Sequence, residues 1–360
     1  MDFQRPITIK DISEHLETWV RETLNPSNIE LSRLSHPAQA TATSLVYAKS
    51  AKHLQPAIDS KAGCMIAHLN LKDRVLNSSW KKPVILSARP ELLVREILQA
   101  FSGITTPYKE LSKTEVHPTA VVDPSATLGK NITVGPRAYI GPNCKIGDNC
   151  YIGLGAVVCK NSQLGSGTTL HPNTYIGHST VIGSHCEIMP QATVGSEGFG
   201  YSQDSKFNHY RIPHGGKVVL GDDVHVGANS CIDRGSLQDT TIGSGTKIDN
   251  LVHIAHNITI GENCLITANV TMAGSSTLGS RMMIGGCTAI DGHIKIADDI
   301  HLQAMSVVTK SLDKPGVYGG FPAIPTMTFK RNQATFTKLS ELRKTVEGLV
   351  KNQKKNEPKA

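Results

Sequence analysis

The sequence of 360 residues contains few aromatic side chains, only 5% of the total. It has no apolar run of membrane-spanning length, and its first ten residues, MDFQRPITIK, contain no apolar signal core. It also lacks an aromatic and basic strand pattern and any known reader motif for nucleic acid. We therefore expect a cytoplasmic protein with no integral membrane segment and no nucleic-acid partner.

The eight cysteines form no CxxC pair. Several of them lie where small buried residues occur in the other repeats of the chain, which are described next. We expect reduced thiols that pack in the interior, rather than disulfides or metal ligands. The cysteines thus predict no metal site.

What the sequence does contain is a six-residue period. From Ile242 to Val308 an aliphatic residue or methionine recurs at every sixth position, and the same rhythm runs without a gap from Val116 to Val194. A period of six is neither helical nor that of a flat strand, so a short unit must repeat. It predicts a left-handed parallel β-helix of roughly ten coils, each of about 18 residues. The interior of such a coil is too narrow for many aromatic rings.

The period divides the chain into three parts. Residues 1–112 lack it and alternate helical and short apolar patterns, which predicts an N-terminal α/β domain with helices over 12–24 and 91–101. Residues 113–320 form the β-helix domain, reached through a connection over 105–117. Residues 321–360 are expected to contain one helix with an apolar stripe. Nine Lys or Arg against three Glu after residue 327 make it basic, either as a solvated face or as a dock for an acidic protein.

Two interruptions break the period, at 195–217 and at 232–242. Insertions leave a stacked core as loops on one face, which is often the binding face. The first interruption gathers aromatic residues, among them Phe199 and Tyr201, beside Lys206, Arg211 and Lys217. It is either an excursion that packs on the outside of the coils or a loop that binds a substrate with a ring and phosphate.

Because each coil contains about 18 residues, residues that are eighteen apart in the sequence lie in one column, one coil apart. From His256, two positions after the inward Ile254, the column contains Gly274, Gly292 and Lys310. Gly274 is then expected roughly 4.8 Å from His256, with His293 about two coils from it near the same edge.

Asp249, just after inward Ile248, is a candidate to orient the His256 imidazole. A neutral His can remove a proton from an amine or hydroxyl, and a backbone N–H at Gly274 can hold an oxyanion. This set is typical of acyl transfer to a nucleophile that the substrate supplies. The alternative is a zinc site built from His253, His256 and His293, which leaves Asp249 and the stacked glycines unexplained.

Seven motifs, in order, carry a family resemblance: GSEGFGY (195–201), GANSCIDRG (227–235), KIDNLVHIAHN (247–257), MAGS (272–275), IGG (284–286), DGH (291–293) and PGVYGG (315–320). With a domain before them, they resemble the UDP-3-O-(3-hydroxyacyl)glucosamine N-acyltransferases of lipid A biosynthesis, which are hexapeptide-repeat acyltransferases.

The resemblance implies a homotrimer that moves a 3-hydroxyacyl chain from acyl carrier protein to the 2-amine of a UDP-linked, 3-O-acylated glucosamine. It also implies no bound cofactor, because the phosphopantetheine of acyl carrier protein carries the acyl donor. In its terms His256 is the general base, Asp249 orients it, and Gly274 supplies the oxyanion amide. His293 would support the substrate or leaving group, and Lys310 would face the phosphopantetheine arm.

The sequence departs from the family in its first domain. Where relatives stack uracil between two aromatics, this chain has Ser44 and Ser50, and Tyr47 would substitute only after a local shift. A divergent nucleotide-sugar acyltransferase with another donor or acceptor, including UDP-N-acetylglucosamine O-acylation, therefore stays open. A β-helical scaffold without activity is the non-enzymatic alternative.

Overall fold

The computed structural model describes residues 1–103, 115–319 and 326–356, so most of the expected connection over 105–117 lies outside the described residues. The chain divides into two compact units, residues 1–110 and 111–360. Each unit has its own buried core and is described separately below.

The first unit is a six-stranded α/β sheet in the order β1-β3-β4-β5-β6-β2. The pairings of β3 to β6 are parallel, whereas β1 and β2 pair antiparallel at the two edges. The strands are β1 (Asp2–Thr8), β2 (Glu22–Leu24), β3 (Glu30–Leu34), β4 (Ser44–Ala48), β5 (Cys64–His68) and β6 (Val84–Ser87). The helices are α1 (Ile9–His15), α2 (Ala51–Ile58), α3 (Lys72–Leu76) and α4 (Pro90–Phe101), with 3₁₀ turns η1 (Pro37–Gln39) and η2 (Leu69–Leu71).

Alternation along the strands puts one core on each face of this sheet. Leu45 packs in a cluster with α1 and α4, whereas Val46 packs in a second cluster with α2 and α3. The expected helix over 12–24 was wrong in its bounds. It begins earlier, because Thr8 and Asp11 form a capping box, and it ends at His15. Thr23 belongs instead to the edge strand β2.

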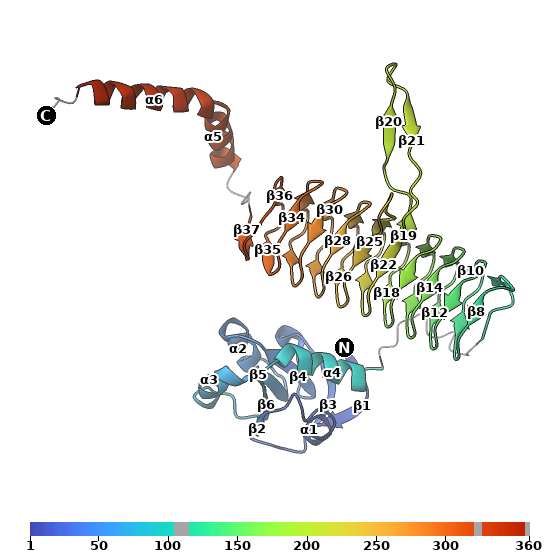
Figure 1. Ribbon diagram of the computed structural model, residues 1–360. Coiled ribbons are helices and arrows are strands. Elements are labelled where there is room, and N and C mark those ends of the chain that lie inside the picture. Colours follow the sequence, from blue (N-terminus) through green and yellow to red (C-terminus); the bar gives the residue numbers. More distant parts are fainter. Residues whose placement is uncertain (104–114, 320–325, 357–360) are drawn as a thin grey trace. The chain divides into compact units, whose positions relative to one another are not determined.

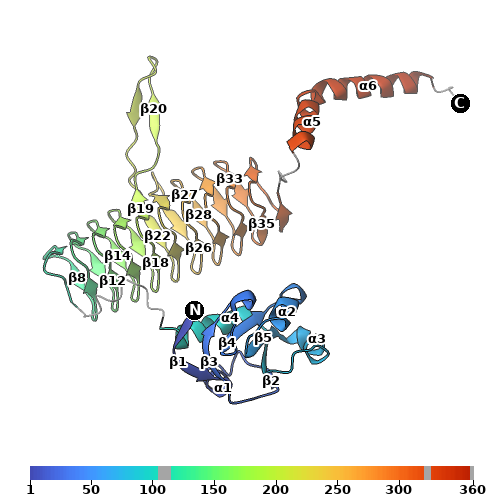
Figure 2. The same ribbon diagram turned by 180° about the vertical axis from the view of Figure 1, so that it is seen from behind.

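The second unit contains the expected left-handed parallel β-helix, whose three sheets are visible from both sides in Figures 1 and 2. Sheet I consists of β7 (Val121–Val122), β10 (Tyr139–Ile140), β13 (Val157–Val158), β16 (Tyr175–Ile176), β19 (Thr193–Ser196), β24 (Cys231–Asp233), β27 (His253–Ile254), β30 (Thr271–Met272), β33 (Ala289–Ile290) and β36 (Val307–Val308). Sheet II consists of β8 (Thr127–Leu128), β11 (Lys145–Ile146), β14 (Gln163–Leu164), β17 (Val181–Ile182), β22 (Val218–Leu220), β25 (Thr240–Ile242), β28 (Thr259–Ile260), β31 (Thr277–Leu278) and β34 (Lys295–Ile296). Sheet III consists of β9 (Thr133–Val134), β12 (Tyr151–Ile152), β15 (Thr169–Leu170), β18 (Glu187–Ile188), β23 (His225–Val226), β26 (Lys247–Ile248), β29 (Leu265–Ile266), β32 (Met283–Ile284), β35 (Ile300–Leu302) and β37 (Gly316–Tyr318).

The six-residue period has two physical causes in the structure. The second residue of nearly every two-residue strand points inward and is buried, as at Ile140, Ile146 and Ile152. Each such side chain contributes about 1.5–3 kcal/mol when fully buried. Most turns also contain one residue with positive φ, such as Asn257 at 61° and Asn263 at 56°, again six residues apart. Asparagine tolerates this conformation better than most residues.

The interruptions leave the coils at one edge. Regular neighbours are 18 residues apart, as for Tyr139 and Val157, but Thr193 pairs with Cys231, so 38 − 18 = 20 extra residues lie between them. Cys231 pairs with His253, a separation of 22 and therefore an insertion of four. Both insertions follow a strand of sheet I and precede one of sheet II. We call the row of turns after the sheet I strands the insertion edge.

The first insertion is an antiparallel hairpin of β20 (Tyr201–Gln203) and β21 (His209–Arg211), seen leaving the coils in Figure 1. The tail holds two helices, α5 (Thr326–Thr337) and α6 (Leu339–Asn356), where we expected one. The hydroxyls of Thr335 and Thr337 bond back to carbonyls of the preceding turn, which competes with helix continuation at Lys338. All eight cysteines are free thiols, and five of them are buried as expected, whereas Cys159 and Cys231 are half-buried and Cys287 is exposed.

Candidate active site

The insertion edge carries the column that the eighteen-residue count predicts. His256 follows β27 by two residues, and Gly274, Gly292 and Lys310 take the same place after β30, β33 and β36. The amide of Ser275 donates to the His256 carbonyl at 3.0 Å, which locks these two turns in register. Because both insertions leave from the turns just before His256, the coils are least regular where the candidate base lies.

Gly274 lies directly against the ring of His256. A Cβ atom at position 274 would lie 2.7 Å from Cε1 and 3.0 Å from both ring nitrogens of that histidine. Any side chain there would push the ring away. The Gly274 N–H is half-buried and donates to no acceptor within the described part of the chain. An imidazole and a free backbone donor thus share one small space.

The orienting partner of His256 is Asn257, not Asp249. His256 Nδ1 lies 2.8 Å from Asn257 Oδ1. The same oxygen accepts from Ser236 N and Oγ, while Asn257 Nδ2 donates to Gln238 O. These contacts fix the amide orientation, so the imidazole must carry its proton on Nδ1 to donate to Oδ1. They also tie the second insertion to the candidate base.

Asp249 lies at a different corner of the coil. It follows β26 in sheet III, whereas His256 follows β27 in sheet I, because each hexapeptide occupies another face of the triangle. Its carboxylate accepts from the amides of Asn250 at 2.8 Å and Ala268 at 3.1 Å. Within a single chain Asp249 therefore does not contact His256, and its carboxylate caps a turn.

His214 is a neighbour of the candidate base that sequence reasoning missed. It ends the hairpin insertion and is only 4% exposed, with its ring centroid 5.1 Å from that of His256. Its Nδ1 bonds to the Ile212 carbonyl at 3.0 Å, and its buried Nε2 has no hydrogen-bond partner among the described residues. Gly198 makes room, since a Cβ there would lie 3.1 Å from both histidines. The six-residue period does not extend into the insertions, so it could not predict the position of His214.

His293 and Lys310 continue the edge. The His293 amide donates to the Gly274 carbonyl at 3.2 Å, and its exposed side chain lies in the turn two coils from His256. Lys310 is exposed and borders a groove of about 320 Å³ that is lined mainly by apolar residues, including Leu312 and Tyr318. Both residues lie at the expected place on the edge.

The hairpin aromatics lie in the open. Phe199 is 83% exposed and its ring centroid lies 5.1 Å from that of Tyr201. The two rings line a groove of about 450 Å³ together with Gln203 and His209. Arg211, one of the expected phosphate contacts, is paired with Glu197 at 2.7 Å.

Tyr47 belongs to the first unit, where it is an outward residue of β4 and is partly exposed. Ser44 is fully buried, and its hydroxyl accepts from the Thr41 amide at 2.9 Å. Ser50 precedes α2 and its hydroxyl lies 2.8 Å from His53 Nδ1. The hydroxyls of the two serines that replace the aromatics thus bond to neighbouring residues of the first unit.

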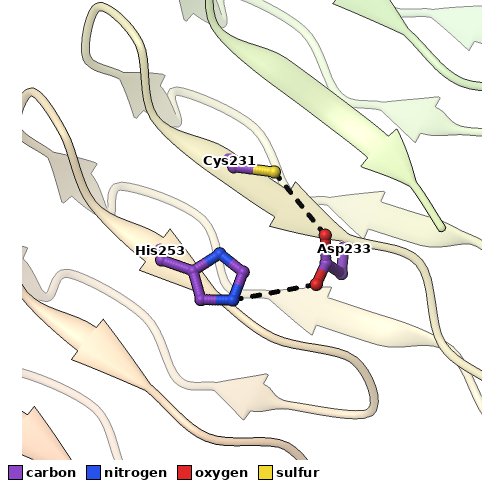
Figure 3. Close-up of side chains that lie close together, drawn as sticks. All are labelled: Cys231, Asp233 and His253. Atoms are coloured by element: carbon purple, nitrogen blue, oxygen red, sulfur yellow. Dashed lines mark hydrogen bonds and ion pairs between the residues drawn. The ribbon is translucent and has the colours of Figure 1, made fainter. Parts of the chain in front are cut away.

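The three-histidine zinc site is not formed. His253 points instead towards Asp233, with Nε2 3.8 Å from Oδ2, on the outer face of sheet I. Within the described residues, the group of three or more metal-ligating side chains is Cys231, Asp233 and His253 (Figure 3). This group excludes both His256 and His293.

The comparisons with known proteins agree with this fold. The family profile described as bacterial transferase hexapeptide (six repeats) matches residues 239–274, and the GMPPB C-terminal domain matches residues 111–237. UDP-3-O-acylglucosamine N-acyltransferase from Methylococcus capsulatus is 42% identical over 155 residues, which is 43% of this chain and 44% of the relative. The enzyme of the same name from Campylobacter lari is 47% identical over 141 residues, 39% of this chain and 44% of the relative.

The chain contains hexapeptide repeats, and part of it is similar in sequence to the UDP-3-O-acylglucosamine N-acyltransferases. The matches span less than half of the length of these curated relatives. Among solved structures, the UDP-N-acetylglucosamine acyltransferase of Arabidopsis superposes with a TM-score of 0.51 at 27% identity, covering 64% of this chain and 81% of that one. None of the helices in the described residues of this hexapeptide-repeat protein is long and apolar enough to cross a membrane.

Proposed function

We propose that the chain transfers a 3-hydroxyacyl group from acyl carrier protein to the 2-amine of UDP-3-O-acylglucosamine, a step of lipid A biosynthesis. The observation that carries the proposal is the pairing of a tautomer-fixed His256 with the free N–H of Gly274 against its ring. A base and an oxyanion donor in one space are the two groups that acyl transfer needs.

The steps follow from the hydrogen bonds. Because Nδ1 of His256 donates to Asn257, its Nε2 is the free base. As the amine attacks the thioester carbonyl, Nε2 takes one amine proton and the Gly274 N–H stabilises the oxyanion. The C–N bond forms, the C–S bond breaks, and the imidazolium returns its proton to the departing thiolate. No group of the protein is acylated, and no cofactor is consumed.

Other features support the substrates. The hairpin groove with Phe199 and Tyr201 offers ring faces to the UDP-sugar, with Tyr47 as a further candidate on the first unit. Lys310, beside a mainly apolar groove, is suited to the phosphate and arm of phosphopantetheine. The basic tail favours docking of an acidic carrier protein. His293 would bind the substrate or the leaving group.

The same edge also suits a hydroxyl acceptor, because His256 and Gly274 do not distinguish oxygen from nitrogen nucleophiles. The solved UDP-N-acetylglucosamine acyltransferase with a similar β-helix favours this second candidate. The two functions predict different products, an amide and an ester, and hydroxylamine cleaves only the ester readily.

The test offers the full chain 3-hydroxyacyl carrier protein or the matching coenzyme A thioester, with UDP-3-O-acylglucosamine or UDP-N-acetylglucosamine. Products are identified by mass and by hydroxylamine treatment. We expect amide from the carrier-bound donor and the first acceptor. Ester from UDP-N-acetylglucosamine would replace the proposal with the second candidate, and no product in any combination would leave the scaffold alternative.

A homotrimer in the cytoplasm completes the proposal. Light scattering of the purified chain is expected to give three times the 38.7 kDa mass of the monomer. A monomer would mean that each site is built by one chain alone.

A further inference from the structure

A second cluster of reactive side chains lies on the outer face of sheet I, apart from the His256 site. Cys231 and His253 are register partners in the adjacent strands β24 and β27. Asp233 ends β24, two residues after Cys231, so it points to the same side. Figure 3 shows the three side chains turned towards one another. The β-helix itself therefore places these groups.

The distances within the cluster are short. Cys231 Sγ lies 3.5 Å from Asp233 Oδ1, and His253 Nε2 lies 3.8 Å from Asp233 Oδ2. All three ligand atoms lie within 4.8 Å of one another. Zinc–ligand bonds of about 2.0–2.3 Å in a tetrahedron separate neighbouring ligand atoms by about 3.3–3.6 Å. Side-chain adjustments of about 1 Å would close the site.

The buried carboxylate of the cluster has few partners. Asp233 is only 5% exposed, and burying a carboxylate is costly unless a cation or several donors face it. Its donors are Ser196 Oγ at 3.0 Å and the neutral Cys231 thiol. Within the described residues its ion-pair partner is the half-exposed His253. Arg234, next in sequence, turns away and donates to the Gly216 carbonyl at 2.8 Å.

We propose that Cys231, Asp233 and His253 bind one Zn²⁺ per chain, with a water molecule as the fourth ligand. Thiolate, imidazole and carboxylate together are a zinc donor set, whereas Mg²⁺ and Ca²⁺ prefer oxygen ligands alone. The half-exposed His253 leaves the fourth position open to solvent. Ser196, bonded to Asp233, would hold the carboxylate in place from the second shell of contacts.

The ion would join two coils where the sheet is irregular. The pairing of β19 with β24 shifts register between Val194 and Ser196, at the point where the hairpin leaves. Ligands from both β24 and β27, with Ser196 of β19 behind them, span three successive strands of sheet I. Because the thiolate is the form that binds zinc, binding would exchange the Cys231 thiol proton for the metal and release it to solvent.

The test measures metal directly on the full chain, without any acyl-transfer assay, so it is independent of the proposed function. The chain is stripped with chelator, incubated with Zn²⁺ or Co²⁺, freed of excess metal and analysed for metal content. We expect one ion per chain, and with Co²⁺ a thiolate-to-metal charge-transfer band.

Two ligand variants, Cys231→Ser and His253→Gln, should each lower the affinity for Zn²⁺ at least tenfold. Cys231→Ser should also abolish the charge-transfer band. Cys287→Ser and His301→Gln, which change exposed residues of other turns and sheets, are the matched controls and should bind as the parent chain does. His253 is exposed enough for His253→Gln to keep the fold, which circular dichroism checks.

Three results would overturn the proposal. The parent chain could take up less than a tenth of an equivalent of either metal, it could bind cobalt without the thiolate band, or the ligand variants could bind as tightly as the controls. Any of these would leave the cluster as side chains in contact with one another, with His253 and Ser196 beside the Asp233 carboxylate.

Discussion

His178 and His256 occupy the same turn position on the insertion edge, and the strands that precede them, β16 and β27, are separated by two strands of sheet I. Each follows an inward isoleucine by two residues. His256 has Gly274 against its ring, Asn257 on Nδ1 and the hairpin residue His214 beside it. His178 has as its side-chain contact only the hydroxyl of its own neighbour, Ser179, at 3.4 Å, within the described residues. The same coil geometry therefore holds a histidine without these neighbours and a candidate base.

The difference lies in the surroundings that the insertions supply. Before β19 the coils repeat every 18 residues with no added loop, and their turns only close the coil. After β19 the hairpin brings His214, and the second insertion brings Ser236 to the amide of Asn257. Regular repeats thus form a rigid support, and the departures from regularity build the site.

The largest expected effect separates the two histidines. His256→Ala should lower kcat for acyl transfer by about 10²–10⁴-fold, the range for loss of a general base. His178→Ala, the matched control, should change kcat by less than about twofold, because its contacts do not reach Gly274. Steady-state kinetics on both variants check this, and equal losses would show that the edge acts only as scaffold.

Gly274→Ala should have the next largest effect. Its Cβ would meet the His256 ring at 2.7 Å and displace it by an ångström or so, which costs about 100-fold in kcat. Gly286→Ala is the control at the same turn position of another edge, where the nearest atom is the Ala268 carbonyl oxygen at 3.2 Å. Both variants are compared by kcat and by melting temperature. Full activity in Gly274→Ala would remove Gly274 from the site.

Asn257→Ala and Asp249→Asn test which residue orients the base. Asn257→Ala removes the acceptor of His256 Nδ1, which costs about 1–1.5 kcal/mol of transition-state stabilisation, or roughly tenfold in kcat. It should also shift the pH–rate profile, because the imidazole is then no longer held in one tautomer. Asp249→Asn keeps an acceptor for only one of the two backbone amides, but this turn lies at another corner of the coil, so kcat should stay within about twofold. The reverse order of effects would restore Asp249 as the orienter.

The smallest effect concerns stability and pH. Burial, with Arg234 and Lys160 adding to it, lowers the pKa of His178 from 6.5. The unfolded chain then binds a proton that the folded chain does not, so the free energy of unfolding falls as the pH drops through that range and recovers above it. His178→Asn should flatten this slope in denaturant titrations between pH 8 and 5. An unchanged slope would show that other groups cause the pH dependence of stability. His225 is one such group, because burial lowers its pKa as well.

The sequence predicts the β-helix well because one inward side chain and one positive-φ turn recur every six residues. The same period placed Gly274 against His256, since an 18-residue step returns to the same corner. Asp249 was expected beside His256 because it lies only seven residues earlier in the chain. That distance leads to another corner of the triangular coil. Asn257 follows His256 directly in the sequence, and its side-chain oxygen can accept a hydrogen bond from His256 Nδ1. This adjacency could have identified Asn257 as the orienting residue. His214 could not be found, since an insertion has no period that places its residues.

The measurement that tests the central claim most directly is single-turnover acyl transfer, with the protein in excess over 3-hydroxyacyl carrier protein and UDP-3-O-acylglucosamine as acceptor. It is run on the parent chain, His178→Ala and His256→Ala. We predict complete conversion to amide at matching rates in the first two and no conversion on that timescale in the third. Equal rates in all three, or no amide from the parent chain, would contradict the assignment of this edge as an acyltransferase site.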